Sequence, residues 1–309
     1  MQIILGTTDF QLNRDSAIAI GKFDGIHIGH KYLVEDIVTT AKRRGISSVV
    51  FTFSPSPESL FAGHKLPELT TTEEKRMAFE QMGIDVLIEF PMTFETAATE
   101  PDLFITKYLV KQMRAKYIAA GADLSFGKKG LGNAALLEDM SKEYGYECNI
   151  IDKILYEGTE ISSTLIRETV EKGDMELVTA LLGSPYKVSG EVSHGRALGR
   201  TIGMPTANVL IPEGKIIGPK GVYYSKTIVD GVCYTSTSNI GIKPTVVNEG
   251  ALCCETYLYG YDGDLYGKNI EVQLMKFVRP EMKFGSVEEL KAQMQMDIAG
   301  GEAYHELVR

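Results

Sequence analysis

One stretch near the start of the chain organises its first half, and it reads Gly21-Lys22-Phe23-Asp24-Gly25-Ile26-His27-Ile28-Gly29-His30. It follows an apolar run at residues 17–20 and precedes residues 32–44, where Leu33, Ile37 and Ala41 recur at helical spacing. We therefore predict a buried strand, a glycine-rich turn and the start of a helix. Glycines let backbone N–H groups approach an anion closely, and a helix N-terminus adds partial positive charge. This turn is suited to the phosphate of a nucleotide.

Two of the chain's five histidines, His27 and His30, fall inside this turn. We expect them on or just before the first helical turn, where two imidazoles can donate hydrogen bonds to charge that develops on a phosphate. The alternative is a tight strand-to-helix turn with two surface histidines. Two histidines within ten glycine-rich residues favour the phosphate site.

The segment His27-Ile28-Gly29-His30 resembles the HxGH signature of the nucleotidylyltransferase superfamily. The longer stretch resembles the GxFDGxHxGH form of bacterial bifunctional riboflavin kinase/FAD synthetases, in which the second activity is FMN adenylyltransferase. The resemblance implies that His27 and His30 are catalytic in adenylyl transfer. The residues of this stretch that it implies for binding ATP or flavin are Gly21, Phe23, Asp24, Gly25 and Gly29.

Predicted strands and helices alternate through the first half of the chain. The further apolar, β-prone runs cover residues 46–53, 86–90, 117–120 and 148–154. One predicted helix starts near Thr71, where threonines precede two glutamates. Another covers residues 103–113. This alternation predicts an α/β domain with a doubly wound parallel sheet, in which ligands bind beyond the carboxyl ends of the strands.

A second segment of the first half matches the same family. Residues 121–133 follow a predicted strand and resemble the family's GxDFxFGxxxxGN loop. The resemblance implies a wall of the flavin and phosphate site. The residues that it implies are Asp123, Phe126, Gly127 and Asn133. Without the resemblance, the segment is a basic, glycine-rich surface loop.

A third segment, residues 161–167, resembles the ISSTxIR motif that closes the site in this family. It implies that Ser162, Ser163 and Thr164 bind ATP or flavin, with the hydroxyls of Ser163 and Thr164 at phosphate oxygens. It also implies that Arg167 is catalytic, since a guanidinium offers a planar fork to phosphate. The alternative is a serine/threonine N-cap on a helix at residues 165–172. Both interpretations can hold, because an N-cap that faces a cleft is also an anion site.

Two positions of the first half depart from the family pattern. Ser56 stands between Pro55 and Pro57 where the family usually has histidine, and Leu124 stands where phenylalanine is usual. Neither lies in HxGH or ISSTxIR. They bear on how the adenylyltransferase half works and how it holds the flavin ring.

The character of the sequence changes near Gly183-Ser184-Pro185. Short β-prone runs follow, separated by turn residues, at residues 187–192, 206–211, 221–229, 233–239, 253–258 and 269–277. They predict a small antiparallel β-barrel, with a C-terminal amphipathic helix at residues 287–298 packed against it. We therefore predict two domains, residues 1–182 and 183–309, and the resemblance implies an FMN adenylyltransferase and a riboflavin kinase respectively.

The second half also resembles the riboflavin kinase module. Residues 190–208 match its GxVxxG…GRxxGxPTAN string, and Glu255 occupies its catalytic glutamate position. By resemblance, Thr206 and Asn208 are ligands of Mg²⁺, a hard cation that prefers oxygen. Glu255 would accept the proton of the riboflavin 5′-hydroxyl. The remaining binding residues implied for this half are Gly195, Gly199, Arg200, Pro205, Asn239 and Arg279.

Composition limits the function further. The 309 residues carry a net charge of −9, which argues against a nucleic-acid partner because no basic stripe is available to neutralise phosphates. No apolar stretch approaches the roughly 20 residues that cross a bilayer, and the N-terminus lacks the basic lead of a signal peptide. We predict a cytoplasmic protein without a membrane partner, monomeric or weakly homo-oligomeric.

The resemblance of both halves to this family implies one primary hypothesis. The chain phosphorylates riboflavin with ATP to give FMN and then joins FMN to ATP, forming FAD and pyrophosphate, with Mg²⁺ as the cofactor. One alternative is a paralogue in which only the kinase is active, motivated by Ser56 and Leu124. Another is a non-catalytic flavin-binding regulator, against which the retained Glu255 weighs, since binding alone needs no base.

Overall fold

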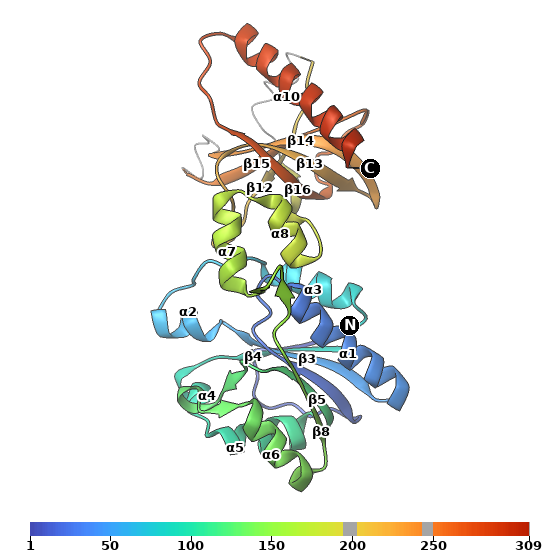
Figure 1. Cartoon of the computed structure of the whole chain (residues 1–309), viewed down its shortest axis with the longest axis vertical. Coiled ribbons are helices and arrows are strands. Elements are labelled where there is room, and N and C mark those ends of the chain that lie inside the picture. Colours follow the sequence, from blue (N-terminus) through green and yellow to red (C-terminus); the bar gives the residue numbers. More distant parts are fainter. Residues whose placement is uncertain (194–202, 243–249, 309) are drawn as a thin grey trace. The chain divides into compact units, whose positions relative to one another are not determined.

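The computed structural model describes residues 1–193, 203–242 and 250–308. The chain divides into two compact units, Met1–Ser163 and Thr164–Arg309, which are taken separately below. Figure 1 shows the elements of both along the chain. The first unit is an α/β domain and the second is a barrel with a C-terminal helix, as the sequence predicts.

The first unit is built on a six-stranded sheet in the order β1-β4-β3-β2-β5-β8. All five pairings are parallel, which confirms the predicted doubly wound arrangement. The strands are β1 (Gln2–Leu5), β2 (Ser16–Ile20), β3 (Ser47–Ser54), β4 (Val86–Pro91), β5 (Ala115–Gly121) and β8 (Glu147–Ile151). Sequence patterning missed β1, whose residues at the edge of the sheet are mostly exposed.

Helices and short elements connect these strands. The helices are α1 (Ile28–Arg44), α2 (Pro57–Ala62), α3 (Thr72–Gln81), α4 (Phe94–Ala97), α5 (Pro101–Leu103), η1 (Phe104–Gln112) and α6 (Ala134–Tyr144). The short pieces are β6 (Ser125–Phe126), η2 (Lys128–Gly130), β7 (Gly132–Asn133), β9 (Leu155–Tyr156) and β10 (Thr159–Glu160). The helix predicted at residues 103–113 is present, but η1 is a π-helix, a wider turn that apolar spacing does not reveal.

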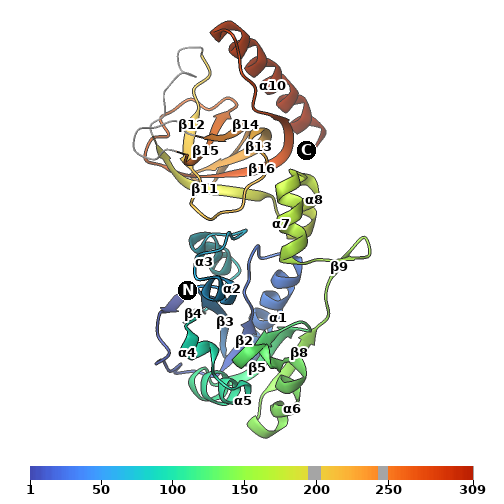
Figure 2. The ribbon, with the colours of Figure 1, turned by 90° about the vertical axis from the view of Figure 1, so that its left-hand side faces the viewer.

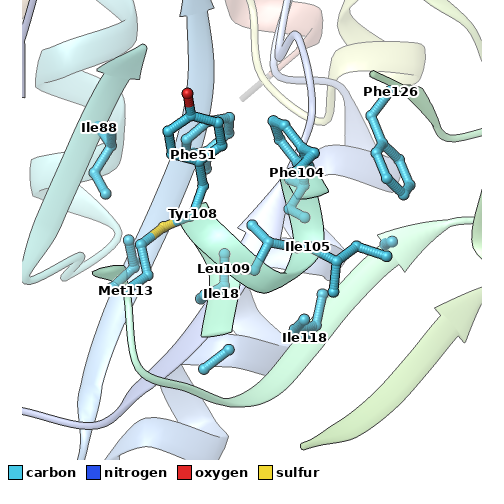
Figure 3. Close-up of a cluster of buried hydrophobic side chains, with 14 of the residues drawn as sticks. Ile18, Phe51, Ile88, Phe104, Ile105, Tyr108, Leu109, Met113, Ile118 and Phe126 are labelled. Atoms are coloured by element: carbon cyan, nitrogen blue, oxygen red, sulfur yellow. The ribbon is translucent and has the colours of Figure 1, made fainter. Parts of the chain in front are cut away.

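Strand β2 lies at the centre, and its two faces carry different side chains. Ile18 and Ile20 join one core cluster, in which η1 supplies Phe104 and Ile105 (Figure 3). On the other face, small alanines alternate with the isoleucines, and α1 packs there. Because alternate residues of a strand face opposite sides, the run of residues 16–20 is buried completely.

The direction of the connections changes at the centre of the sheet. From β2 the chain moves to its neighbour β3, whereas β5 lies on the other side of β2 and continues to β8. In open parallel sheets, ligands bind at such a switch point, beyond the carboxyl ends of the strands. The histidine turn follows β2 and the loop at residues 121–133 follows β5. The fold therefore brings both motifs to the switch point.

The second unit is a closed antiparallel barrel in the order β11-β12-β15-β14-β13-β16, completed by pairing of β16 with β11. Its strands are β11 (Tyr186–Ser193), β12 (Ala207–Leu210), β13 (Gly221–Val229), β14 (Val232–Ile242), β15 (Leu252–Leu258) and β16 (Asn269–Pro280). Two helices, α7 (Ser163–Lys172) and α8 (Met175–Leu182), precede them, and α8 packs on β11 and β16. All six strands were predicted from the sequence, with ends shifted by up to a few residues.

The last helix, α10 (Val287–Leu307), runs along β13 and β14 (Figures 1 and 2). The sequence prediction ended it at residue 298, just before the pair Gly300-Gly301, and glycine is unfavourable inside a helix. That end was wrong, and packing explains why. A Cβ on Gly300 would stand 2.3 Å from the Tyr224 hydroxyl, and one on Gly301 would stand 2.2 Å from that of Tyr259. The two glycines let the helix lie directly on the barrel.

Candidate functional site

The turn after β2 is held in an unusual backbone conformation. Phe23 has φ of 52° and Ile26 has φ of 40°, both in the left-handed region that side-chain-bearing residues rarely adopt. The carboxylate of Asp24 stabilises the turn by accepting hydrogen bonds from the backbone N–H groups of Leu69 and Thr70, at 2.8 and 3.2 Å. Such strain persists where the surroundings fix it, and it clusters at functional sites.

His27 and His30 form one stacked pair at the start of α1. Their ring centroids lie 3.8 Å apart with an interplanar angle of 20°. His27 is the N-cap of α1, and its Nδ1 accepts from the backbone N–H of His30 at 3.4 Å. Gly29 makes this possible, since a Cβ there would stand 3.2 Å from the His27 ring. Neither is a fully exposed surface histidine, because His27 is only 9% exposed and His30 is partly buried.

The environment favours neutral imidazoles. Burial lowers the pKa of His27 to about 4, although the charges of Asp123 and Asp24 act in the opposite direction. Burial also lowers the pKa of His30, and the charges of His27 and Lys75 lower it further. Because Nδ1 of neutral His27 accepts a hydrogen bond, its proton resides on Nε2. His27 can therefore present Nε2–H as a neutral donor near pH 7.

This depressed pKa predicts a specific acid sensitivity. Between pH 6.5 and 4, unfolded His27 binds a proton and folded His27 does not, so stability falls as the pH decreases through this window. The loss at His27 amounts to about 3 kcal/mol by pH 4. Urea unfolding at several pH values should show a shallower pH dependence in His27→Gln than in the unchanged protein. If stability falls equally steeply with pH in both proteins, the pKa of His27 is not lowered.

The loop after β5 combines exposed and buried predicted residues. Asp123 is exposed and electrostatically coupled to His27, and a Cβ on Gly121 would lie 3.0 Å from its carboxylate. Phe126 is only 3% exposed, and its ring packs on Phe104 in the core (Figure 3). The structure thus gives Phe126 a packing role, and its predicted contact with flavin stays a prediction.

Two other predicted binding residues of this loop have clear local roles. Gly127 has φ of 68° and packs closely against the backbone of Pro101. Asn133 is the N-cap of α6, where its Oδ1 accepts from the backbone N–H of Leu136 at 3.0 Å. Their predicted contacts with ATP or flavin stay predictions.

The ISSTxIR segment is divided between the two units. In the first unit, the Ser163 hydroxyl donates to the backbone carbonyl of Asp24 at 2.8 Å and so ties the motif to the glycine turn. Ser162 directly precedes α7, which begins two residues before the predicted helix. Thr164 and Arg167 lie on α7 in the second unit. Their predicted action on phosphate stays a prediction.

The two departures from the family pattern have structural roles of their own. Ser56 is the N-cap of α2, accepting from the backbone N–H of Ser59 at 3.2 Å. Leu124 is partly buried against the core cluster of η1. Both residues therefore fit the local structure without the usual side chains.

Sequence reasoning missed an exposed aromatic pair in the first unit. Phe61 on α2 and Phe94 on α4 are 66% and 69% exposed, and their rings meet edge to face at 6.1 Å. These helices follow β3 and β4, so both rings lie after carboxyl ends of the sheet. The only signal was their position after predicted strands, because single exposed phenylalanines are common.

In the second unit, three predicted residues form one row across the barrel. Asn208 on β12 pairs with Glu255 on β15, which pairs with Asn239 on β14. Paired residues share a face, and their Cβ atoms lie about 5 Å apart. Thr206 lies two residues before Asn208 and is half-buried, whereas Asn208 is 5% exposed. The row therefore places the Glu255 carboxylate beside Asn208, one of the two proposed oxygen ligands.

A cavity of about 290 Å³ adjoins this row, between the barrel and α10. Thr206, Asn239, Glu255 and Arg279 line one part of it. The other lining residues are Val222, Thr237, Ser238, Tyr257, Glu281, Met282, Phe284, Leu290, Met294, Asp297 and Ile298. Apolar side chains such as Phe284, Leu290 and Met294 line the cavity together with many polar and charged ones, and small-molecule sites likewise combine apolar walls with polar groups. The cavity can hold an aromatic ligand whose hydroxyl groups form hydrogen bonds with the carboxylate of Glu255 and the amide of Asn239.

Four further predicted binding residues of this half lie before β12. Pro205 is exposed just before β12. Gly195, Gly199 and Arg200 lie outside the described residues.

The comparisons with known proteins cover both units. A family model described as FAD synthetase matches residues 9–165, and one described as riboflavin kinase matches residues 182–305. The bifunctional riboflavin kinase/FMN adenylyltransferase of Listeria monocytogenes is 34% identical over 295 residues, 94% of this chain and 93% of its own. That of Escherichia coli K12 is 37% identical over 283 residues, 91% of this chain and 90% of its own.

A solved structure is similar to this chain over nearly its whole length. A crystal structure from Streptococcus pneumoniae, described as a macrolide-efflux protein, has a TM-score of 0.84 and 29% identity, covering 97% of this chain and 98% of that one. Among the residues described here, no helix combines the length and apolar character that crossing a membrane requires.

Proposed function

The chain belongs to the family of bifunctional riboflavin kinase/FMN adenylyltransferases, and from this premise we infer which of its residues carry each reaction. It phosphorylates riboflavin to FMN and then adenylylates FMN to FAD, using ATP in both steps. We propose that residues 1–182 carry adenylyl transfer and residues 183–309 carry the kinase. The start of the riboflavin kinase model at residue 182 supports the proposed start of the second domain, whereas the FAD synthetase model ends at residue 165 and the compact units divide after Ser163.

The observation that carries the kinase assignment is the row Asn208–Glu255–Asn239 beside the cavity. Riboflavin would lie with its ring toward the apolar walls and its 5′-hydroxyl at Glu255. The hydroxyl oxygen forms a bond to the γ-phosphorus of ATP as the bond from that phosphorus to ADP breaks, and the hydroxyl proton passes to the Glu255 carboxylate. Asn239, on the neighbouring strand, would orient the flavin or the glutamate by hydrogen bonding.

The proposed Mg²⁺ fits the residues present. Thr206 and Asn208 supply a hydroxyl and an amide oxygen, and no group of three or more histidine, cysteine or acidic side chains suited to a metal occurs among the described residues. Mg²⁺ usually keeps several waters and binds through few protein ligands plus substrate phosphates, so two oxygen donors suffice. When bound, the ion supplies charge neutralisation at the β- and γ-phosphates.

For adenylyl transfer, we propose that the switch point of the sheet binds ATP. The FMN phosphate is already a nucleophile, and its oxygen bonds to the α-phosphorus as pyrophosphate leaves. The protein must therefore align the groups and stabilise the departing charge. Neutral His27 and His30 would donate hydrogen bonds to the phosphates, together with Ser163, whose hydroxyl already bonds to the glycine turn. The phosphate-binding roles that the motif implies for Thr164 and Arg167 stay predictions.

We assign the flavin end of this second site to the exposed aromatic pair. Phe61 and Phe94 present exposed rings on the helices that follow β3 and β4. Strand β3 is a direct neighbour of β2, which leads into the histidine turn, and β4 lies on the other side of β3. Aromatic rings stack on one another favourably, which suits an isoalloxazine ring. Asp123 and Gly127 remain proposed neighbours of the flavin phosphate.

A single incubation tests both assigned activities. The full-length protein, given riboflavin, ATP and Mg²⁺, should produce FMN first and then FAD with pyrophosphate, separated by chromatography. Chelation of the metal with EDTA should stop both steps, since uncomplexed ATP phosphates would repel the nucleophile. FMN as the sole product would favour the kinase-only alternative, and flavin binding without any product would favour a non-catalytic regulator.

A further inference from the structure

Arg279 is already occupied in this structure. Its Nε and Nη2 donate to the two carboxylate oxygens of Asp297, at 3.1 and 2.6 Å, and its Nη1 donates to the backbone carbonyl of Pro280 at 3.0 Å. This two-pronged geometry is the strong form of an ion pair. The pair is also shielded, since the side chains of Arg279 and Asp297 are 18% and 7% exposed. By resemblance Arg279 faces the flavin, yet its Nε and Nη2 groups are already hydrogen-bonded to Asp297.

The partner of this arginine lies on α10. Asp297 is on the helix and Arg279 is near the end of β16, so the ion pair joins the helix to the barrel. Both residues line the cavity that we assign to riboflavin. One turn earlier, the Gln293 amide also donates to Oδ1 of Asp297, at 3.0 Å. The carboxylate therefore accepts three hydrogen bonds within the cavity wall.

Burial along α10 shows why this contact matters. All residues of the helix are described, and those that are buried are Asp297, Gly301 and His305, at four-residue spacing. None of the preceding turns, residues 287–296, has a buried residue. Those turns nevertheless supply Leu290 and Met294 to the cavity. Asp297 is thus the first buried anchor behind the part of the helix that covers the cavity.

We propose that Asp297 is a positioning residue of the riboflavin kinase: by holding Arg279, it fixes the first turns of α10 as the flavin-facing wall of the cavity. The proposal rests on the assignment of this cavity to riboflavin. The oxygen ligands proposed for Mg²⁺ and ATP, Thr206 and Asn208, lie on and beside β12 and do not belong to the helix. Asp297 should therefore act on flavin binding and leave nucleotide binding unchanged.

The central variant is Asp297→Asn in the full-length protein. It keeps the size of the side chain but leaves the shielded guanidinium without its counterion, which is strongly unfavourable for the docked helix. The KM for riboflavin should rise at least about tenfold, while kcat and the KM for ATP stay within about threefold. Asp297→Glu, which keeps the charge, should recover most of the loss. Glu302→Gln, a neutralised exposed carboxylate on the same helix, is the matched control.

Three readouts separate this role from simple destabilisation. FAD formation from added FMN, measured in the same variants, reports the other activity and should not change. An equal rise of both KM values, or a lower melting temperature with an unchanged riboflavin KM, would overturn the proposal. If Asp297→Asn does not fold, Arg279→Lys, which keeps the charge but loses the fork, must show the same split between the two KM values.

Met294→Ala distinguishes failure of this proposal from failure of the proposed function. Met294 lines the cavity directly and takes no part in the ion pair. If Met294→Ala raises the riboflavin KM and Asp297→Asn does not, the role of Asp297 is wrong and the flavin cavity stands. If neither substitution changes the riboflavin KM, the cavity is not the flavin site.

Discussion

Replacing both His27 and His30 by alanine is expected to reduce FAD formation from FMN by about a thousandfold or more, while FMN formation from riboflavin continues. Removal of a single aligned donor to developing charge commonly lowers kcat by about 10²–10³, and here two stacked imidazoles are removed together. The expected selectivity follows from the location of the histidines in the first unit and of the kinase row in the second.

The double variant needs two controls. His64→Ala removes an exposed histidine of the same unit and should leave both activities unchanged. Because His27 also caps α1, its loss destabilises the helix by about 1 kcal/mol, so His27→Asn, which retains a capping side chain, should lose activity without that penalty. Retention of normal FAD synthesis by the double variant would refute the role of the histidine pair.

Changing Glu255 to glutamine should have the opposite selectivity. The substitution preserves the shape of the side chain but removes the group that accepts the hydroxyl proton, which is typically worth about 10²–10⁴ in rate. FMN formation from riboflavin should fall by this factor, and FAD formation from added FMN should persist. Initial rates measured separately with riboflavin and with FMN give both values.

The control for this variant is Glu213→Gln, which neutralises an exposed glutamate of the same unit and should change neither rate. Unchanged FMN production by Glu255→Gln would exclude Glu255 as the base. Its cross-strand partners Asn208 and Asn239 would then need another explanation for their common row.

Much of the fold was predictable because its signals are local. Apolar runs such as residues 17–20 lie on strands buried on both faces, and each predicted strand is present. The errors arose where tertiary contacts override local preference. Helix α10 continues through Gly300-Gly301, where a side chain would collide with Tyr224 and Tyr259, which lie far away in the sequence. Strand β1 exists because it pairs with β4, and its exposed residues carry no periodic signal of burial.

In the candidate site, too, local sequence signals were readable and tertiary contacts were not. The resemblance of contiguous segments made His27, His30 and Glu255 candidates, and their roles stay predictions. The contacts that support them join distant segments and leave no local pattern. Asp24 accepts from Leu69, 45 residues away, and Arg279 pairs with Asp297 across 18 residues and two different elements. Only the structure reveals these partners.

The position of Ser56 illustrates how a departure from a family pattern can be accommodated. It caps α2, a task that serine performs well. The hydrogen bond within the histidine pair joins the backbone N–H of His30 to Nδ1 of His27, and Ser56 serves the separate helix α2. We therefore expect the adenylyltransferase half to be active, in agreement with family membership over both halves.

The most direct test of two separate sites is complementation between the two variants. Neither Glu255→Gln nor His27→Ala/His30→Ala alone should convert riboflavin to FAD. An equimolar mixture should do so, because FMN released by one protein is adenylylated by the other, and chromatography should show FMN appearing before FAD. If either variant loses both activities, or the mixture forms no FAD while each variant retains its remaining activity, the assignment of the two reactions to separate sites is wrong.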